Sequence, residues 1–168
     1  LRYGSALGHH HDDNLNIEMW AHGDVVTPEL GYPSWAHPMG DTSHAAHHVT
    51  GMIDRQSQYR GAIGKGALQS FSGAPEASFT EVSAEPNRFP NRVYRRAVCL
   101  ADAPGGNVYL FDVLRMAGGT TRTYCFHGPG HEAFDSSIEF PEPAKEAWDI
   151  SGIRRGLEVN VVNPATRE

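Results

Sequence analysis

The sequence has no run of apolar residues approaching the ~20 that a membrane-spanning helix needs. It also has no cluster of lysine and arginine, and its net charge is −6, so the basic footprint of a nucleic-acid-binding protein is missing. Only 2 of its 168 residues are cysteine. These absences predict a protein without a membrane span and without a nucleic-acid partner.

The two cysteines, Cys99 and Cys125, suggest a disulfide at first sight. If turns join strands at 93–101, 107–116 and 119–126, however, both cysteines flank the same middle strand. Two strand spacings come to ~9.6 Å, which is beyond the reach of a disulfide. The sequence therefore predicts free, buried thiols and says nothing about the redox compartment.

The composition, with 39% hydrophobic residues, 18 glycines and 11 prolines, is typical of a turn-rich, mainly β domain. Short apolar or alternating segments separated by turn residues predict an all-β fold, an antiparallel β-sandwich. Residues 108–113 are apolar at nearly every position, which predicts a strand buried between layers. The expected strands are 14–20, 48–54, 66–71, 77–83, 93–101, 107–116 and 119–126.

Histidine is concentrated near the start, where "GHHHDDNLN" (residues 8–16) contains three in succession. A purification-tag remnant is one explanation, but the run leads directly into the alternating pattern of Leu15 and Ile17. If that strand extends back to His9, then His9 and His11 point to the same face. The run is therefore a candidate for metal binding or for acid/base chemistry.

A zinc site needs about four nitrogen, sulfur or oxygen ligands gathered from several segments. The candidates come from the first strand, the end of the following apolar piece and the approach to the next strand: His9, His11, Glu29, His44, His47 and His48. A cupin-like barrel is an alternative, but its acid usually follows the second histidine by four or five positions. Leu15 and Asn16 stand at those positions, which disfavours it.

Four segments, in order over about residues 4–130, resemble the heparinase II/III-like polysaccharide lyases. "GHHHDDNLN" resembles the motif H-x-H-x-D-x-L-N, and "VVTPELGYPSW" resembles the segment that carries an acidic metal ligand. "HVTGMIDRQSQ" is similar to the H-N-T-V-x-x-D-G stretch. "YRRAVCLADAPGGNVYLFDVLRMAGGTTRTYCFHGPG" is similar to the R-R strand, hairpin and H-G that follow.

The resemblance implies an α/α toroid followed by a large antiparallel β-sandwich, with the cleft between them. Residues 1–168 would be part of the sandwich, truncated at both ends, and inactive without the toroid. The implied reaction is β-elimination on a uronic-acid-containing polysaccharide, in the periplasm or outside the cell. The implied partners are an acidic polysaccharide or oligosaccharide and the toroid of the same protein.

Residue by residue, the resemblance assigns a catalytic role to His9 and one structural zinc ion to His11, Glu29 and His48. Glu29 replaces the usual aspartate, and His47 is the alternative ligand if the register slips by one position.

Further residues around these positions have weaker assignments. Asp13 could orient a ligand histidine or could be an ordinary strand-edge carboxylate, and Tyr32 and Trp35 could contact a sugar or simply pack on the sandwich. One of the adjacent residues Arg95 and Arg96 could meet an anionic sugar. A different class of function also stays open: a non-catalytic β-sandwich that binds carbohydrate, or a structural domain stabilised by a metal.

Overall fold

The computed structural model describes residues 1–4, 10–32, 42–58, 66–84 and 93–128. Within these ranges the chain is built from antiparallel β-strands, together with a single 3₁₀ turn, which confirms the all-β, sandwich-like fold expected from the sequence. The elements are β1 (Met19–Ala21), β2 (Asp24–Thr27), η1 (Ala45–His47), β3 (Gly51–Ile53), β4 (Gly66–Ala74), β5 (Ala77–Ala84), β6 (Tyr94–Ala103), β7 (Asn107–Met116) and β8 (Arg122–Tyr124). None of the described segments is a helix long and apolar enough to cross a membrane.

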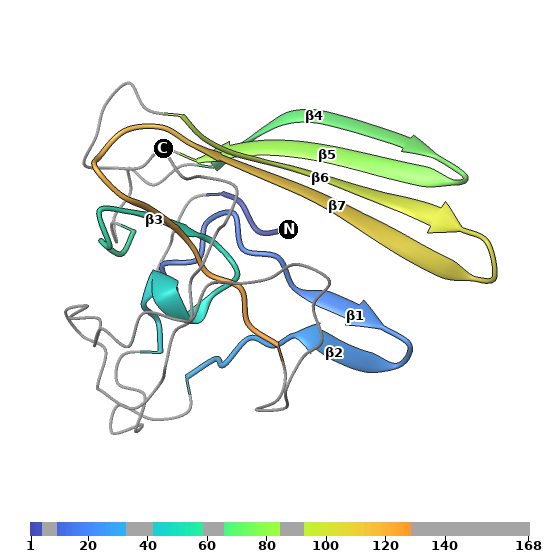
Figure 1. Cartoon of the computed structure of the whole chain (residues 1–168), viewed down its shortest axis with the longest axis horizontal. Coiled ribbons are helices and arrows are strands. Elements are labelled where there is room, and N and C mark those ends of the chain that lie inside the picture. The colour runs from blue at the N-terminus through green and yellow to red at the C-terminus, as the bar shows by residue number, and fades with distance from the viewer. Residues whose placement is uncertain (5–9, 33–41, 59–65, 85–92, 129–168) are drawn as a thin grey trace, which may run out of the picture.

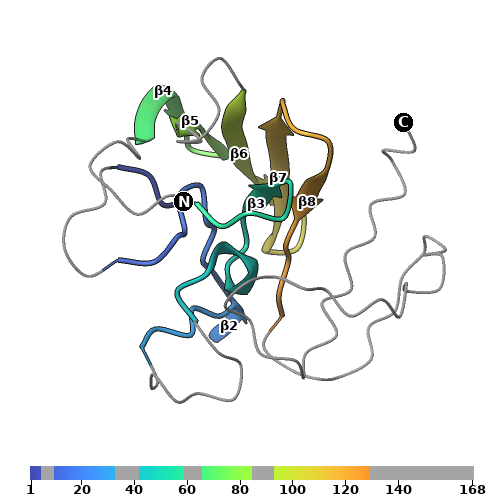
Figure 2. The ribbon, with the colours of Figure 1, turned by 90° about the vertical axis from the view of Figure 1, so that its left-hand side faces the viewer.

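The strands form one four-stranded sheet and two strand pairs. The sheet has the order β4-β5-β6-β7, and the pairs are β1-β2 and β3-β8. Figure 1 shows the sheet as the longest feature of the molecule, with β1 and β2 on one side of it. In Figure 2 the β3-β8 pair lies beneath the same side of the sheet. We call this side the inner face of the sheet and the opposite side the outer face.

Residues with positive φ place the hairpin turns where the sequence predicts them. His22 (φ 54°) and Gly23 (φ 84°) join β1 to β2, and two successive positive φ values are what a type I′ turn requires. Gly105 (φ 80°) and Gly106 (φ 76°) close the β6-β7 hairpin. These positive φ values lie outside the backbone conformations that residues with a Cβ adopt easily, so each turn contains glycine.

The main core lies between the inner face of the sheet and the segment at residues 15–17. Leu15, Val82, Ala84 and Tyr94 are buried together there, and Leu114 is packed against them. A smaller cluster lies under η1 and consists of Ala45, Ala46, Met52 and Cys125.

A fully buried arginine, Arg96 of β6, connects the sheet to the strands beneath it. Its Nε and Nη2 donate to the two carboxylate oxygens of Asp112 at 2.7 and 2.6 Å, and Nη2 also donates to the Tyr124 hydroxyl at 2.8 Å. Its Nη1 donates to the carbonyls of Leu15 and Val49 at 2.6 and 2.5 Å. All five guanidinium donors are therefore used, which satisfies the condition for burying such a group.

The expected strand over 14–20 is wrong at its start. Leu15 has φ 64°, a rare conformation for a bulky residue, and with Asn14 it forms a turn. Strand structure begins only at Met19. A buried turn and a half-buried strand both place apolar side chains inside, so the alternation of Leu15 and Ile17 did not distinguish them.

The prediction of free thiols is confirmed, but the reasoning behind it and the expected burial of both cysteines are not. Both thiols are free. β8, however, pairs with β3 and not with β7, so Cys125 does not flank the strand that Cys99 flanks. Only Cys125 is buried, and Cys99 is half-buried. The glycines in the connection after β7 suggest a hairpin turn, but in the structure this connection leads the chain away from the sheet to β3.

The prediction that 108–113 is buried between layers is also wrong for the described structure. Val108, Tyr109, Phe111 and Val113 are each between 53 and 61% exposed. β7 is an edge strand of the four-stranded sheet, and its apolar side chains on the outer face have no layer of described residues over them.

Candidate metal centre

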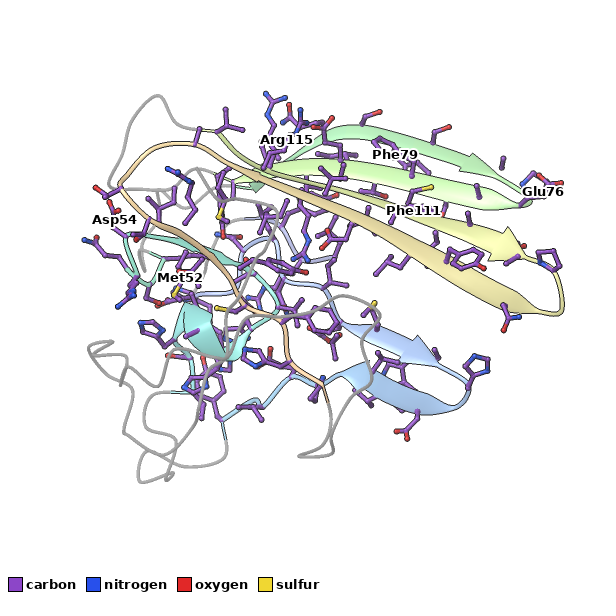
Figure 3. The ribbon with its side chains drawn as sticks, viewed as in Figure 1. Met52, Asp54, Glu76, Phe79, Phe111 and Arg115 are labelled. Atoms are coloured by element: carbon purple, nitrogen blue, oxygen red, sulfur yellow. The ribbon has the colours of Figure 1, made fainter. Side chains whose placement is uncertain are left out.

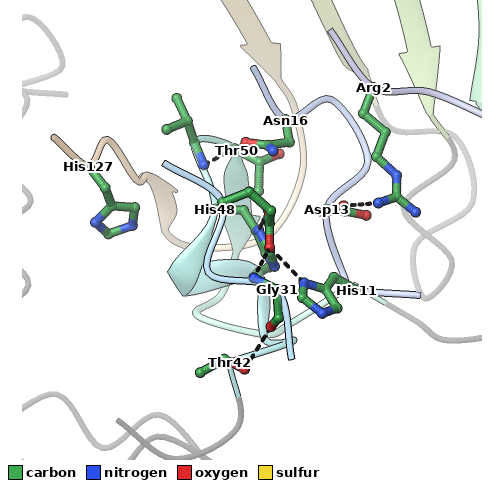
Figure 4. A network of polar contacts seen from close by, with 12 residues as sticks. Arg2, His11, Asp13, Asn16, Gly31, Thr42, His48, Thr50 and His127 are labelled. Atoms are coloured by element: carbon green, nitrogen blue, oxygen red, sulfur yellow. Dashed lines mark hydrogen bonds and ion pairs between the residues drawn. The ribbon is translucent and has the colours of Figure 1, made fainter. Parts of the chain in front are cut away.

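The structure brings together the three residues expected to bind metal. Glu29 Oε1 lies 2.9 Å from His11 Nδ1, and Glu29 Oε2 lies 2.8 Å from His48 Nδ1 (Figure 4). One potential ligand atom from each residue lies within 4.8 Å of the other two. This separation is close to the ~4 Å that ligand bonds of ~2.1 Å allow around one ion. The cluster can hold a metal ion.

The protonation of the cluster suits a cation. Burial alone would raise the pKa of Glu29, but the hydrogen bond and charge of His48, the Gly31 N–H and the nearby His11 outweigh it and lower the pKa to about 2. The carboxylate is thus ionised and accepts from both Nδ1 atoms.

The second nitrogen of each histidine is also open to a ligand. Nε2 of His11 and Nε2 of His48 are buried and have no hydrogen-bond partner in the part of the chain that the structure describes. A cation held through these atoms would give them the partner that buried polar atoms normally have. The donor set of two imidazoles and a carboxylate is one that zinc accepts.

Each ligand comes from a different segment, and local backbone structure positions it. Glu29 follows β2, and its carboxylate also accepts the N–H of Gly31 at 3.1 Å. Gly31 has φ 61°, and its carbonyl accepts from the Thr42 hydroxyl at 3.2 Å. His48 directly follows η1 and caps it through its backbone N–H to Ala45. The turn at 29–31 and the 3₁₀ turn therefore aim two ligands at the third.

Two polar residues of the family-like segments hold the ligand-bearing segments together. Asn16 Oδ1 accepts the N–H of Val49 at 2.8 Å, next to the ligand His48. The Thr50 hydroxyl donates to the carbonyl of Asn14 at 2.7 Å and lies 3.0 Å from the Tyr94 hydroxyl. The first and third segments of the resemblance are thus joined directly. Their positions were matched from the sequence, but their structural role was not predicted.

Asp54, the aspartate of the third segment, accepts hydrogen bonds from the backbone of the fourth segment. It has φ 53°, and its Oδ1 accepts the N–H groups of Thr120 and Thr121 at 2.6 and 2.9 Å. A Cβ at Gly119 would collide with this carboxylate, which explains the glycine there. Asp54 shapes the connection between β7 and β8 and is not a ligand candidate.

The weaker assignments are resolved unevenly. Asp13 is buried and forms an ion pair with Arg2, so the contact found for it is to the N-terminal segment and not to a ligand histidine. Burial raises the pKa of Asp13, and Arg2 partly opposes this. The ring of Tyr32 stands edge-on to His11, with centroids 4.3 Å apart and an interplanar angle of 76°, and Tyr32 is 53% exposed. His9 and Trp35 lie outside the described residues.

Two further alternatives are also resolved. Of the two adjacent histidines His47 and His48, His48 is the one that forms the cluster with His11 and Glu29. Arg96 is wholly occupied in the interior and cannot meet a sugar, whereas Arg95 is exposed on the outer face.

Comparison of the chain with protein-family models, with curated proteins and with solved structures gave no match. The function is therefore inferred from the fold and from the geometry of the site.

Proposed function

We propose that this chain supplies the metal-binding β-sandwich side of the cleft of a polysaccharide lyase, which cleaves a uronic-acid-containing polysaccharide by β-elimination. The observation that carries the proposal is the convergence of His11, Glu29 and His48 on one point. These are the positions that match the metal ligands in the family the sequence resembles. The three residues lie in separate segments of the sequence, and the fold brings them together.

β-Elimination needs three functions and no water. A base removes the proton on C5 of the uronate, a positive or hydrogen-bonding group stabilises the charge on its carboxylate, and an acid protonates the leaving oxygen on C4. The C4–O bond breaks as the C4=C5 double bond forms. We assign to His9 a proton-transfer or charge-stabilising part in this reaction. The acid/base tyrosine and the groups that neutralise the carboxylate belong to the expected toroid.

The metal is proposed to be a single zinc ion with a structural role. When bound, zinc would supply positive charge and fix the three ligand segments. The residues themselves do the positioning: Glu29 links the two imidazoles, and Gly31 and Asn16 orient the segments that carry Glu29 and His48. In the sequence, His11 lies two positions after His9, the proposed catalytic residue.

A non-catalytic, metal-stabilised or carbohydrate-binding sandwich is the second candidate. The burial of His11 and His48 in a cluster that joins three segments favours it, since a metal bound there would stabilise the fold. The two candidates share the metal and differ in whether His9 has a substrate to act on. We place the protein in the periplasm or outside the cell in either case, where acidic polysaccharide is available.

The test is lyase activity of the full-length protein on a panel of uronate polymers that includes heparin, heparan sulfate and alginate. Each elimination creates an unsaturated uronate, which absorbs in the ultraviolet. We expect one polymer class to produce this absorbance. Binding of a polymer without the absorbance, by protein whose metal content is verified, would favour the second candidate. Neither binding nor absorbance would leave only the structural role.

A further inference from the structure

Of the four strands of the sheet, β7 carries the largest number of exposed large apolar side chains. Among the described strands, β7 pairs only with β6, so the backbone N–H and C=O groups on its other side have no strand partner in the described part of the chain. The side chains of this strand are also exposed, on the inner face at Val108 (56%) and on the outer face at Tyr109 (61%), Phe111 (59%) and Val113 (53%). Figure 3 shows Phe111 on β7.

The edge lacks the features that usually prevent strand pairing. Such edges are protected by bulges, prolines or free charges. The β6-β7 ladder runs over ten residue pairs without a register shift, and β7 contains no proline. The two charged residues of β7 both form ion pairs within the sheet, Asp112 with Arg96 and Arg115 with Glu81.

The opposite edge of the sheet provides the contrast. β4 has a register shift between Leu68 and Ser70, so its ladder with β5 is irregular. A bulge bends and twists an edge away from regular pairing. Of the two edges, β7 is therefore the one suited to accept another strand.

We propose that β7 pairs antiparallel with β7 of a second copy of this chain, around a two-fold axis perpendicular to the sheet. This makes a continuous eight-stranded sheet from two four-stranded ones. Residues directly opposite one another then point to the same face, and the interface is the same surface on both copies. It is independent of the proposed function, because β7 carries none of the metal ligands.

Charge and length select one register. Placing Phe111 opposite its own copy pairs residues 107–115 along nine positions. Tyr109 faces Val113, Val108 faces Leu114 and Asn107 faces Arg115, so aromatic and branched side chains meet and no like charges do. Shifting the centre to Asp112 places two carboxylates opposite each other, and shifting it to Leu110 shortens the ladder.

A sugar ring fits this surface less well than a strand. Tyr109 and Phe111 have ring centroids 6.4 Å apart and an interplanar angle of 49°, so the two rings do not form a flat stacking platform. The unpaired backbone groups of the edge are also best satisfied by another strand.

The test is a charge swap at the two-fold position, followed by sedimentation of the full chain. We expect wild type to be dimeric. F111K and F111E should each be monomeric at the concentration where wild type is dimeric, because each places two like charges directly opposite. An equimolar mixture of the two variants should form dimers again. F71K is the matched control, since Phe71 is 67% exposed on the β4 edge and its variant should stay dimeric.

A monomeric wild type, a dimeric F111K or F111E, or a mixture that stays monomeric would each overturn the proposal. If the charged variants do not fold, the decisive variant is F111C in a C99S background, since Cys99 lies beside Phe111 in the ladder and would otherwise compete. Oxidation should link F111C to its own copy, and failure to cross-link rejects this pairing.

Discussion

Arg96 and Asp112 form a two-point ion pair across neighbouring strands, with N···O distances of 2.7 and 2.6 Å and the arginine side chain fully buried. The same guanidinium binds two backbone carbonyls that lie far away in the sequence. Because this group connects the sheet to the segments that carry the metal ligands, the stability of the site depends on it.

Replacing Arg96 by lysine should destabilise the protein by about 3 to 5 kcal/mol, the cost of breaking a buried charged network. An ammonium group has no planar fork and cannot serve all five acceptor contacts. The measurement is urea unfolding followed by circular dichroism. Arg95→Lys is the control, because Arg95 is exposed on the outer face and its change should stay within about 0.5 kcal/mol. Equal effects of the two substitutions would contradict the role assigned to Arg96.

Removing the metal should lower the melting temperature of wild type, because a ligand that binds only the folded state stabilises it. His48→Ala should lose the metal, and its melting temperature should then no longer respond to EDTA. His47→Ala should keep both the metal and the response, since His48 is the histidine in contact with Glu29. The measurements are metal analysis and a thermal melt with and without EDTA. Metal lost from His47→Ala but retained in His48→Ala would reverse the assignment.

The two thiols should react very differently with a thiol reagent under native conditions. Burial raises the pKa of Cys125 to about 12, so at neutral or mildly alkaline pH it stays protonated and does not react. Cys99 is half-buried and within reach of the reagent. We expect one thiol to be labelled in native protein and two after unfolding. Peptide mapping that finds the native label on Cys125 would disprove the burial of this thiol among Ala45, Ala46 and Met52.

Under the proposed lyase function, substitutions at the two histidines of the H-x-H motif should have different effects on the full-length protein. His9→Ala should lower turnover by about 10² to 10⁴, the usual contribution of a positioned acid/base group, while metal content and melting temperature stay near wild type. His11→Ala should lose metal and stability together, with activity falling as a consequence. The measurements are initial rates, metal analysis and thermal melts on the same preparations. If His9→Ala loses the metal and His11→Ala retains it, the two roles must be exchanged.

The sequence predicts local features of this molecule well. Glycine between segments of alternating polarity predicts the turns at His22-Gly23 and Gly105-Gly106. The short connection between β6 and β7 predicts that these two strands form a hairpin. The cluster of His11, Glu29 and His48 was expected from the resemblance of three short motifs, whereas residue types and spacing alone left further histidines as candidates. Neither result depended on knowing which distant segments are neighbours.

The features that sequence reasoning missed depend on distant contacts. The pairing of β8 with β3 is decided by the connection that Asp54 holds, and no local pattern shows it. Two adjacent arginines look alike in the sequence, yet one is interior because Asp112 and two carbonyls meet there. The positive φ of Leu15 is rare enough that a strand was the better expectation.

The contacts of Arg96 also bear on how quickly this chain can fold. Its guanidinium joins β6 to the carbonyls of Leu15 and Val49, which are 81 and 47 residues away along the chain. Contacts of such long sequence separation require large loops to close before any energy is gained, and folding rates fall accordingly. Folding should therefore be slow for a domain of this size, with the segments of the ligand histidines ordered only after β6 and β7 have paired.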